Sequence, residues 1–162
     1  MEQITDKSFI ENRNKTSGMH FEEMISYSCK KYHEEGKLYM WNPSMQKTAQ
    51  SDYKGTLVGG MGFVFDAKYT STNMISQNAV TDKQFEDFDF CHGLGAVCFV
   101  LVSIRFESFY RVPWCVWKNM ENMFGHKYMT FEELQPYKIK ATSDRIFFLD
   151  DISTIDDSAA GE

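Results

Sequence analysis

The chain lacks several features that would place it in common functional classes. It has no run of about 18 apolar residues, so nothing predicts a membrane-spanning helix. Its first residues contain neither a basic segment nor an apolar one, and we therefore expect no signal peptide. Four cysteines are spread over the chain without a CxxC pair, which excludes the usual spacing of zinc sites and disulfide frameworks. These absences predict a cytoplasmic protein with reduced, buried cysteines and no membrane partner.

Positive charge is also scarce. Lys and Arg number 17 against 23 Asp and Glu, which gives a net charge of -6. Because basic side chains that neutralise phosphates dominate affinity for nucleic acid, this balance argues against a generic nucleic-acid binder. Much of the acidity gathers in residues 144–162, where six acidic residues stand against the single base Arg145. We interpret this segment as an acidic C-terminal tail.

The remaining composition predicts one folded domain. Hydrophobic residues make up 43% of the chain and aromatic residues 15%, which is enough for a chain of this length to bury a core. Residues 1–17 are polar and predict a flexible N-terminal arm, and residues 18–143 then form the folded domain. No internal repeat, linker or low-complexity block divides this domain.

Hydrophobic periodicity predicts the elements of the domain. Apolar residues at helical spacing predict a helix over 19–34, and a capping box at Thr81–Gln84 predicts the start of another helix that ends near residue 92. The other predictions are strands at 38–41, 62–69, 96–104 and 108–112, a loop at 70–78, and short helices at 114–123 and 130–134. With a partner segment that opens at Asp52, this order predicts an α/β fold, a central mixed β-sheet of about five strands flanked by α-helices.

The strand at 62–69 carries the candidate site. Residues two apart in a strand share a face, so Asp66 and Lys68 stand side by side while Phe65 points into a core. Asp52 brings a second carboxylate to the same surface. Hard divalent cations such as Mg²⁺ take oxygen ligands of this kind, and a neighbouring lysine can hold a water or offset charge on a phosphate. The pattern indicates metal-dependent hydrolysis of phosphodiesters.

Each of these residues also has an ordinary structural interpretation. An Asp-x-Lys pair on an exposed strand is commonly a solvated ion pair that contributes about 0–1 kcal/mol. Glu22 lies beside the apolar stripe of the first helix, either as a third acidic ligand or as a boundary residue with its head in solvent. Gln84 either faces the site or, as the third residue of the capping box, bonds back to the Thr81 amide. The residues alone leave these alternatives open.

The order and spacing of these motifs resemble the RecU-type Holliday junction resolvases of bacteria and phages. That family belongs to the restriction-endonuclease-like, PD-(D/E)xK nuclease superfamily. The similarity extends from about Asn12 to Trp117. The segments that carry it are Asn12-Arg13, Phe21-Glu22, Asn42-Pro43, Ser51 to Gly55, Phe65 to Lys68, Gln84, Gly95 to Val102 and Phe109 to Pro113. The resemblance implies a restriction-endonuclease-like fold and a structure-selective endodeoxyribonuclease of DNA recombination and repair.

By position, the resemblance implies a role for each candidate residue. Lys68 would orient the attacking water, and Gln84 lies where the family places a glutamine near the active site. The implied cofactor is Mg²⁺ or Mn²⁺. Its implied ligands are Asp52, Asp66, the carbonyl oxygen of Ala67, and Glu22.

The resemblance further implies a homodimer whose two active sites nick two opposed strands of a four-way or otherwise branched DNA. One feature departs from the family. Its members carry a long insertion before the first aspartate, a stalk that enters the junction, whereas here only residues 44–50 separate Asn42-Pro43 from Ser51. Two alternatives therefore stay open on the same fold: a nickase or restriction-like nuclease on duplex or branched DNA, and a non-catalytic DNA-binding module.

Overall fold

The computed structural model describes residues 6–42 and 53–152, and within the first helix it describes side chains from residue 20 onward. The helices are α1 (Asp6–Glu34), η1 (Gln77–Ala79), α2 (Asp82–Gly93), α3 (Trp114–Lys118), α4 (Met120–Phe124), α5 (Phe131–Leu134) and η2 (Gln135–Tyr137). The strands are β1 (Leu38–Trp41), β2 (Tyr53–Leu57), β3 (Gly62–Thr70), β4 (Met74–Ser76), β5 (Val97–Ile104), β6 (Ser108–Pro113), β7 (Tyr128–Thr130) and β8 (Lys138–Ile139).

The strands form two sheets. The main sheet has six strands in the order β1-β2-β3-β5-β6-β8, in which β3 and β5 run parallel and the other neighbours are antiparallel. This confirms the predicted α/β fold with a mixed sheet, which has one strand more than the five or so expected. A second, two-stranded sheet pairs β4 with β7. The prediction of a loop at 70–78 was therefore wrong for β4, because its partner lies far along the chain and leaves no local pattern.

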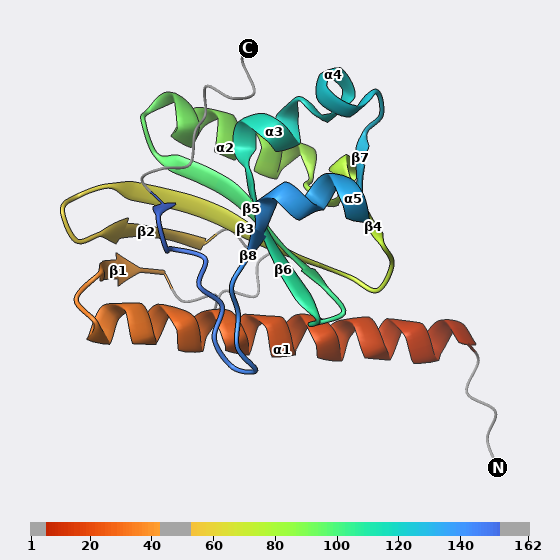
Figure 1. The fold of residues 1–162 in the computed structure, drawn as a ribbon, viewed down its shortest axis with the longest axis horizontal. Helices are drawn as coiled ribbons and strands as arrows, with labels where there is room; N and C mark the ends of the chain where they lie inside the picture. The colour runs from red at the N-terminus through yellow and green to blue at the C-terminus, as the bar shows by residue number, and fades with distance from the viewer. Residues whose placement is uncertain (1–5, 43–52, 153–162) are drawn as a thin grey trace.

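Helices cover both faces of the main sheet, with α1 on one face and α2 and α3 on the other (Figure 1). On the α1 face, Ile25 and Phe65 belong to one buried cluster. On the α2 face, Phe88 and Trp114 belong to a second cluster that includes Val64. Because Val64 and Phe65 are consecutive, the alternation of β3 supplies side chains to both clusters. Strand β3 is thus an interior strand that is covered on both faces.

Helix α1 begins at Asp6, earlier than the sequence predicted. We expected a flexible arm over residues 1–17 and a helix from Met19. Between Asp6 and Glu34 the chain has no proline and a single glycine, so no residue in this stretch stops a helix. The first half of α1 extends past the main sheet (Figure 1). Residues 1–5 of the expected arm lie outside the described residues.

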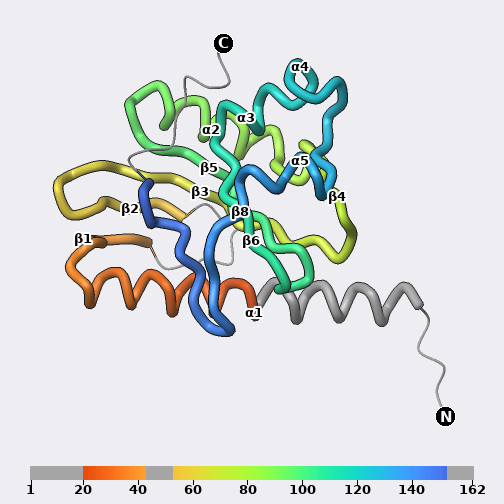
Figure 2. The backbone as a smooth tube through the Cα atoms, in the orientation of Figure 1, coloured from red at the N-terminus to blue at the C-terminus, as the bar shows by residue number. Residues whose placement is uncertain are grey.

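The first part of the predicted acidic tail belongs to the folded domain. After β8 the chain passes α1, turns back and runs along the same face of the sheet (Figure 2). The acidic residues Asp144, Asp150 and Asp151 of this segment are exposed, whereas the apolar residues between them other than Phe147 are buried. The buried residues are Ile146, Phe148, Leu149 and Ile152. The domain therefore extends past residue 143, and residues 153–162 lie outside the described part of the chain.

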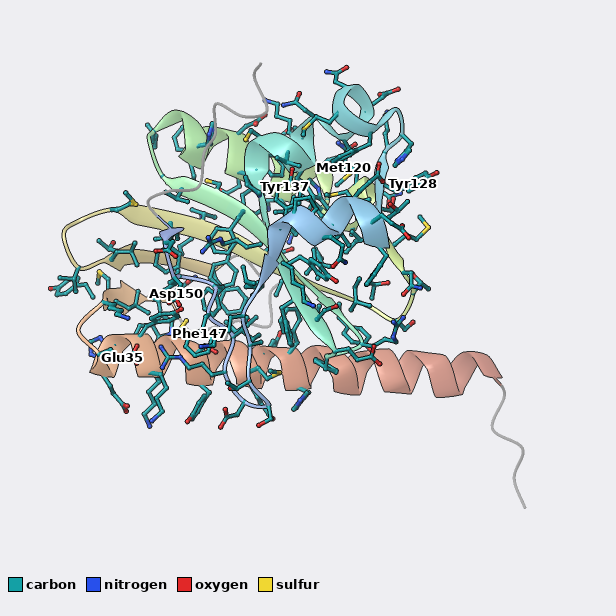
Figure 3. All side chains as sticks on the ribbon, viewed as in Figure 1. Glu35, Met120, Tyr128, Tyr137, Phe147 and Asp150 are labelled. Atoms are coloured by element: carbon teal, nitrogen blue, oxygen red, sulfur yellow. The ribbon has the colours of Figure 1, made fainter. Side chains whose placement is uncertain are left out.

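Polar contacts also fasten this C-terminal segment to α1. The hydroxyl of Tyr32 donates to Asp150 Oδ1 at 2.7 Å and accepts from the Leu149 amide at 3.3 Å. Burial, with the hydrogen bond to Asp150, raises the pKa of Tyr32 far above its ordinary value. Nearby, Arg145 forms a two-pronged ion pair with Glu35 at 2.6 and 2.9 Å. Figure 3 shows Phe147 and Asp150 above the C-terminal end of α1, where Glu35 follows the helix.

Truncating Phe148 to alanine is expected to destabilise the protein by about 3–5 kcal/mol, because its wholly buried ring packs against Tyr32 and Phe65. Urea unfolding followed by circular dichroism measures this loss. The matched control is Phe147→Ala, since Phe147 is the partly exposed neighbour. An equal, small loss in both variants would contradict the inclusion of this segment in the core.

The expectations about membranes and cysteines can be compared with the described residues. In the part of the chain that the structure describes, no helix combines the length and apolar character needed to span a bilayer. All four cysteines are free. The prediction that they are buried is confirmed for Cys29 and Cys98 and is wrong for Cys91 and Cys115, which are partly exposed. Burial raises the pKa of the Cys29 thiol to about 12.

Candidate active site

Strand β3 brings two of the predicted site residues into the interior of the protein. Phe65 lies opposite Tyr53 of β2, and the next residue, Asp66, lies beside Val100 of β5. From Asp66 onward, the only partner of β3 among the described residues is β5.

Asp66 and Lys68 form a buried ion pair. Lys68 Nζ lies 2.8 Å from Asp66 Oδ2, the Asp66 side chain has no exposed surface, and the Lys68 side chain keeps 20% of its surface exposed. The ion pair between Asp89 and Lys118 lies on the surface and differs in this respect. The Asp89 side chain has 38% of its surface exposed, and the Lys118 side chain has 46%. Enclosing a carboxylate in this way carries a desolvation cost that a solvated surface pair avoids. The interpretation of Asp66 and Lys68 as an ordinary exposed ion pair is therefore wrong.

Gln84 completes the capping box and also contacts Lys68. Gln84 is the third residue of α2. Its side-chain Oε1 accepts a hydrogen bond from the backbone N–H of Thr81 at 3.0 Å, and the backbone N–H of Gln84 donates to Thr81 Oγ1 at 3.2 Å. This confirms the predicted capping box. The same Oε1 also accepts from Lys68 Nζ at 3.4 Å. The capping box thus fixes the orientation of the Gln84 side-chain amide, and this amide in turn holds the ammonium group of Lys68.

Glu22 stands apart from this group. It is exposed on α1, on the opposite face of the main sheet from α2 and Gln84. It shares one flank of α1 with His33, three helical turns further on, and the His33 ring lies 5.5 Å from the Trp41 ring of β1. Among the described residues, no hydrogen bond or ion pair joins Glu22 to Asp66.

The donor atoms suit a hard cation, although the described residues do not complete a site for one. Among the side chains that the structure describes, in residues 20–42 and 53–152, no three His, Cys, Asp or Glu residues gather closely enough to hold a metal. Asp52, the first predicted ligand, lies outside the described residues and directly precedes β2. The carboxylate of Asp66 and the carbonyl of Ala67 are oxygen donors of the kind that Mg²⁺ and Mn²⁺ prefer. A second carboxylate from Asp52 would fit this chemistry.

Replacing Gln84 with alanine is expected to lower stability by about 1 kcal/mol and to remove a hydrogen-bond acceptor from Lys68. We expect a matching loss of activity of about tenfold, because the lysine would no longer be held. The matched control is Glu133→Ala, which removes the same position of the second capping box, at Thr130. Thermal unfolding and an assay of single-turnover activity separate the two effects. Equal activity in the two variants would contradict a role for Gln84 in the site.

A family model described as recombination protein U matches residues 37–157, which is well over half of the chain. The matched segment contains Asp52, Asp66, Lys68 and Gln84, whereas Glu22 precedes it. A search of curated proteins finds no match to the chain.

Proposed function

Because the chain belongs to the recombination protein U family, we propose that it is a metal-dependent endonuclease that resolves four-way DNA junctions. Family membership supports a role in DNA recombination. The observation that carries the chemistry is the Asp66–Lys68 pair, which is buried in the main sheet and bonded to Gln84. A carboxylate and an ammonium group held together at this depth suit a reaction on a charged substrate better than they suit stability.

We expect Asp52, Asp66 and the carbonyl of Ala67 to hold Mg²⁺ or Mn²⁺. Glu22 is exposed on α1, apart from this group, and we do not include it among the ligands. When bound, the metal would supply Lewis-acid stabilisation of the phosphate and would lower the pKa of a bound water. The burial of Asp66 favours this use of its carboxylate, because a carboxylate shielded from bulk water attracts a cation strongly.

Lys68 is placed to act on the reacting groups. An ammonium group has three N–H donors, and Asp66 and Gln84 accept two of them. The third can donate to an attacking water or to an oxygen of the scissile phosphate. The positive charge of Lys68 would then offset the negative charge that develops on the phosphate in the transition state.

Resolution of a junction requires cuts in two opposed strands, so we propose that the protein acts as a homodimer with one site in each subunit. The decisive experiment uses end-labelled DNA of one sequence in three forms: a four-way junction, a flapped duplex and a linear duplex. With Mg²⁺, we expect symmetric paired nicks in the junction and slow or no cleavage of the linear duplex.

Each alternative predicts a different pattern in this panel. Equal rates on the linear duplex and the junction would indicate a nickase or restriction-like nuclease, and would contradict junction resolution. A protein that binds DNA, cleaves none of the three forms, and binds no Mn²⁺ in calorimetry would be a non-catalytic DNA-binding module.

A further inference from the structure

Lys54 of β2 lies on the same face of the main sheet as the buried pair. It is opposite Val64 of β3, and Val64 belongs to the buried cluster on the α2 face. Since residues two apart in a strand share a face, Asp66 follows Val64 on that face. Lys54 and Asp66 are therefore diagonal neighbours on adjacent strands, a relation that places two residues about 7–8 Å apart. The lysine thus lies beside the residues that we propose carry out the reaction.

Helix α2 contacts both lysines of this face. Gln84 accepts the hydrogen bond from Lys68 Nζ. Three residues further along α2, Asp87 Oδ2 lies 2.8 Å from Lys54 Nζ. Residues three apart lie on one flank of a helix, so a single flank of α2 sets the position of both ammonium groups. The buried pair and Lys54 therefore have a common support.

Lys54 differs from Lys68 in its access to solvent. The Lys54 side chain has 46% of its surface exposed, against 20% for Lys68. Lys54 also lines a surface pocket of about 370 Å³ over β1 and β2, together with Met40 and Thr56. Met40 lies opposite Thr56, which is two residues from Lys54, so the three side chains share one face. A molecule that occupies this pocket would contact Lys54 next to the buried pair.

The chemistry of this surface suits a strand of DNA. Because the net charge of the chain is -6, its affinity for phosphates must come from the few basic residues that are placed where the substrate lies. An exposed ammonium group on a long stem binds a phosphate oxygen as a point charge. A strand whose scissile phosphate lies at Asp66 and Lys68 has its next phosphate a short distance away. A lysine that is a diagonal neighbour of Asp66 can reach that phosphate.

We propose that Lys54 is a substrate-binding residue, which holds the backbone phosphate next to the scissile one while the cleaved strand continues over β1 and β2. This inference rests on the proposed nuclease function and adds to it the path of the substrate strand. Asp87 is the positioning residue, since it sets where the ammonium group of Lys54 lies. Because Lys54 does not touch the reacting atoms, its loss should weaken DNA binding and raise KM while kcat stays constant.

The first test measures binding of a labelled four-way junction, with Ca²⁺ in place of Mg²⁺, over a series of salt concentrations. Loss of one phosphate contact lowers the slope of log affinity against log salt by about 1. We expect this decrease in Lys54→Met, with a dissociation constant that is roughly five- to tenfold higher at about 0.1 M salt. Lys54→Arg keeps the positive charge and should retain the wild-type slope.

The matched control is Lys118→Met. Lys118 also pairs with an aspartate of α2, Asp89, and its side chain is likewise 46% exposed. Asp87 and Asp89 are two residues apart, so they do not share a flank of the helix. The control should keep the affinity and the salt slope of the wild type. Both methionine variants should melt near the wild-type temperature, because exposed ion pairs contribute little to stability.

The second test locates the phosphate that Lys54 contacts. In two modified junctions, a neutral methylphosphonate replaces one or the other of the phosphates that flank the scissile phosphate. At one of these positions, we expect the replacement to weaken binding of the wild type by about as much as Lys54→Met does. Combining that replacement with Lys54→Met should cause no further loss, because both changes remove the same contact.

The outcomes for the inference and for the proposed function are distinct. Wild-type affinity and salt slope in Lys54→Met, an equal loss in Lys118→Met, or losses that add at both flanking phosphates would overturn the inference alone. A decrease in kcat with unchanged KM in Lys54→Met would also overturn it. A wild-type protein that binds the junction but cleaves no DNA in Mg²⁺ or Mn²⁺ would overturn the proposed function, and with it the placement of Lys54 beside a scissile phosphate.

Discussion

Replacing Asp66 with asparagine is expected to lower Mg²⁺-dependent cleavage of a four-way junction by at least about 10³-fold. The substitution keeps the shape of the side chain but removes the negative charge that we propose holds the metal. Stability should change by no more than about 2 kcal/mol, because asparagine no longer requires a buried charge while Lys68 keeps Gln84 as an acceptor. Loss of activity in a folded protein is therefore the expected outcome.

Single-turnover nicking of a labelled junction measures the rate, and a gel shift in Ca²⁺ measures binding. Binding should remain close to that of the wild type, since the substitution leaves the surface unaltered. Asp89→Asn is the matched control, because Asp89 pairs with Lys118 in a similar way but on the surface. Wild-type activity in Asp66→Asn, or an equal loss in Asp89→Asn, would contradict the assignment of Asp66.

The second large effect is expected from Lys68→Met. Methionine keeps much of the apolar stem but removes the ammonium group, which leaves the buried carboxylate of Asp66 without that counterion. Breaking a buried pair from one side typically costs about 3–5 kcal/mol, and we expect a loss in this range. Cleavage should fall by about 10²–10³-fold, because the group that we propose offsets charge on the phosphate is gone.

A double variant separates the two consequences of losing Lys68. Combining Lys68→Met with Asp66→Asn removes both charges, so much of the lost stability should return while cleavage stays absent. Urea unfolding and the nicking assay together measure this. Lys118→Met is the control in both measurements, because the ion pair of Lys118 with Asp89 is exposed. Losing this exposed pair should change stability by only about 0–1 kcal/mol. A double variant less stable than Lys68→Met would contradict the coupling of the two side chains.

The sequence predicts the parts of this structure that depend on local patterns. The alternation along β3 correctly assigned Phe65 to a core, and the capping box at Thr81 and Gln84 formed as expected. Both features arise from residues a few positions apart, whose side chains have a fixed relation in a strand or a helical turn.

Features that depend on distant residues were missed. Strand β4 exists because β7 pairs with it from far along the chain. The buried residues Ile146 and Phe148 stand among acidic neighbours, so composition suggested a tail where α1 and the sheet provide a core. The burial of Asp66 also depends on residues that are distant in the chain. Its sequence neighbours predicted a carboxylate on a polar surface, and only the covering of β3 on both faces removes it from solvent.

The central proposal is that the buried pair on β3 is part of a metal-dependent centre that cuts DNA. Its most direct test is the rate at which the wild-type protein nicks a labelled four-way junction in Mg²⁺ and in EDTA. We predict paired nicks in Mg²⁺ and none in EDTA. Equal cleavage in EDTA, or no cleavage in either Mg²⁺ or Mn²⁺, would contradict it.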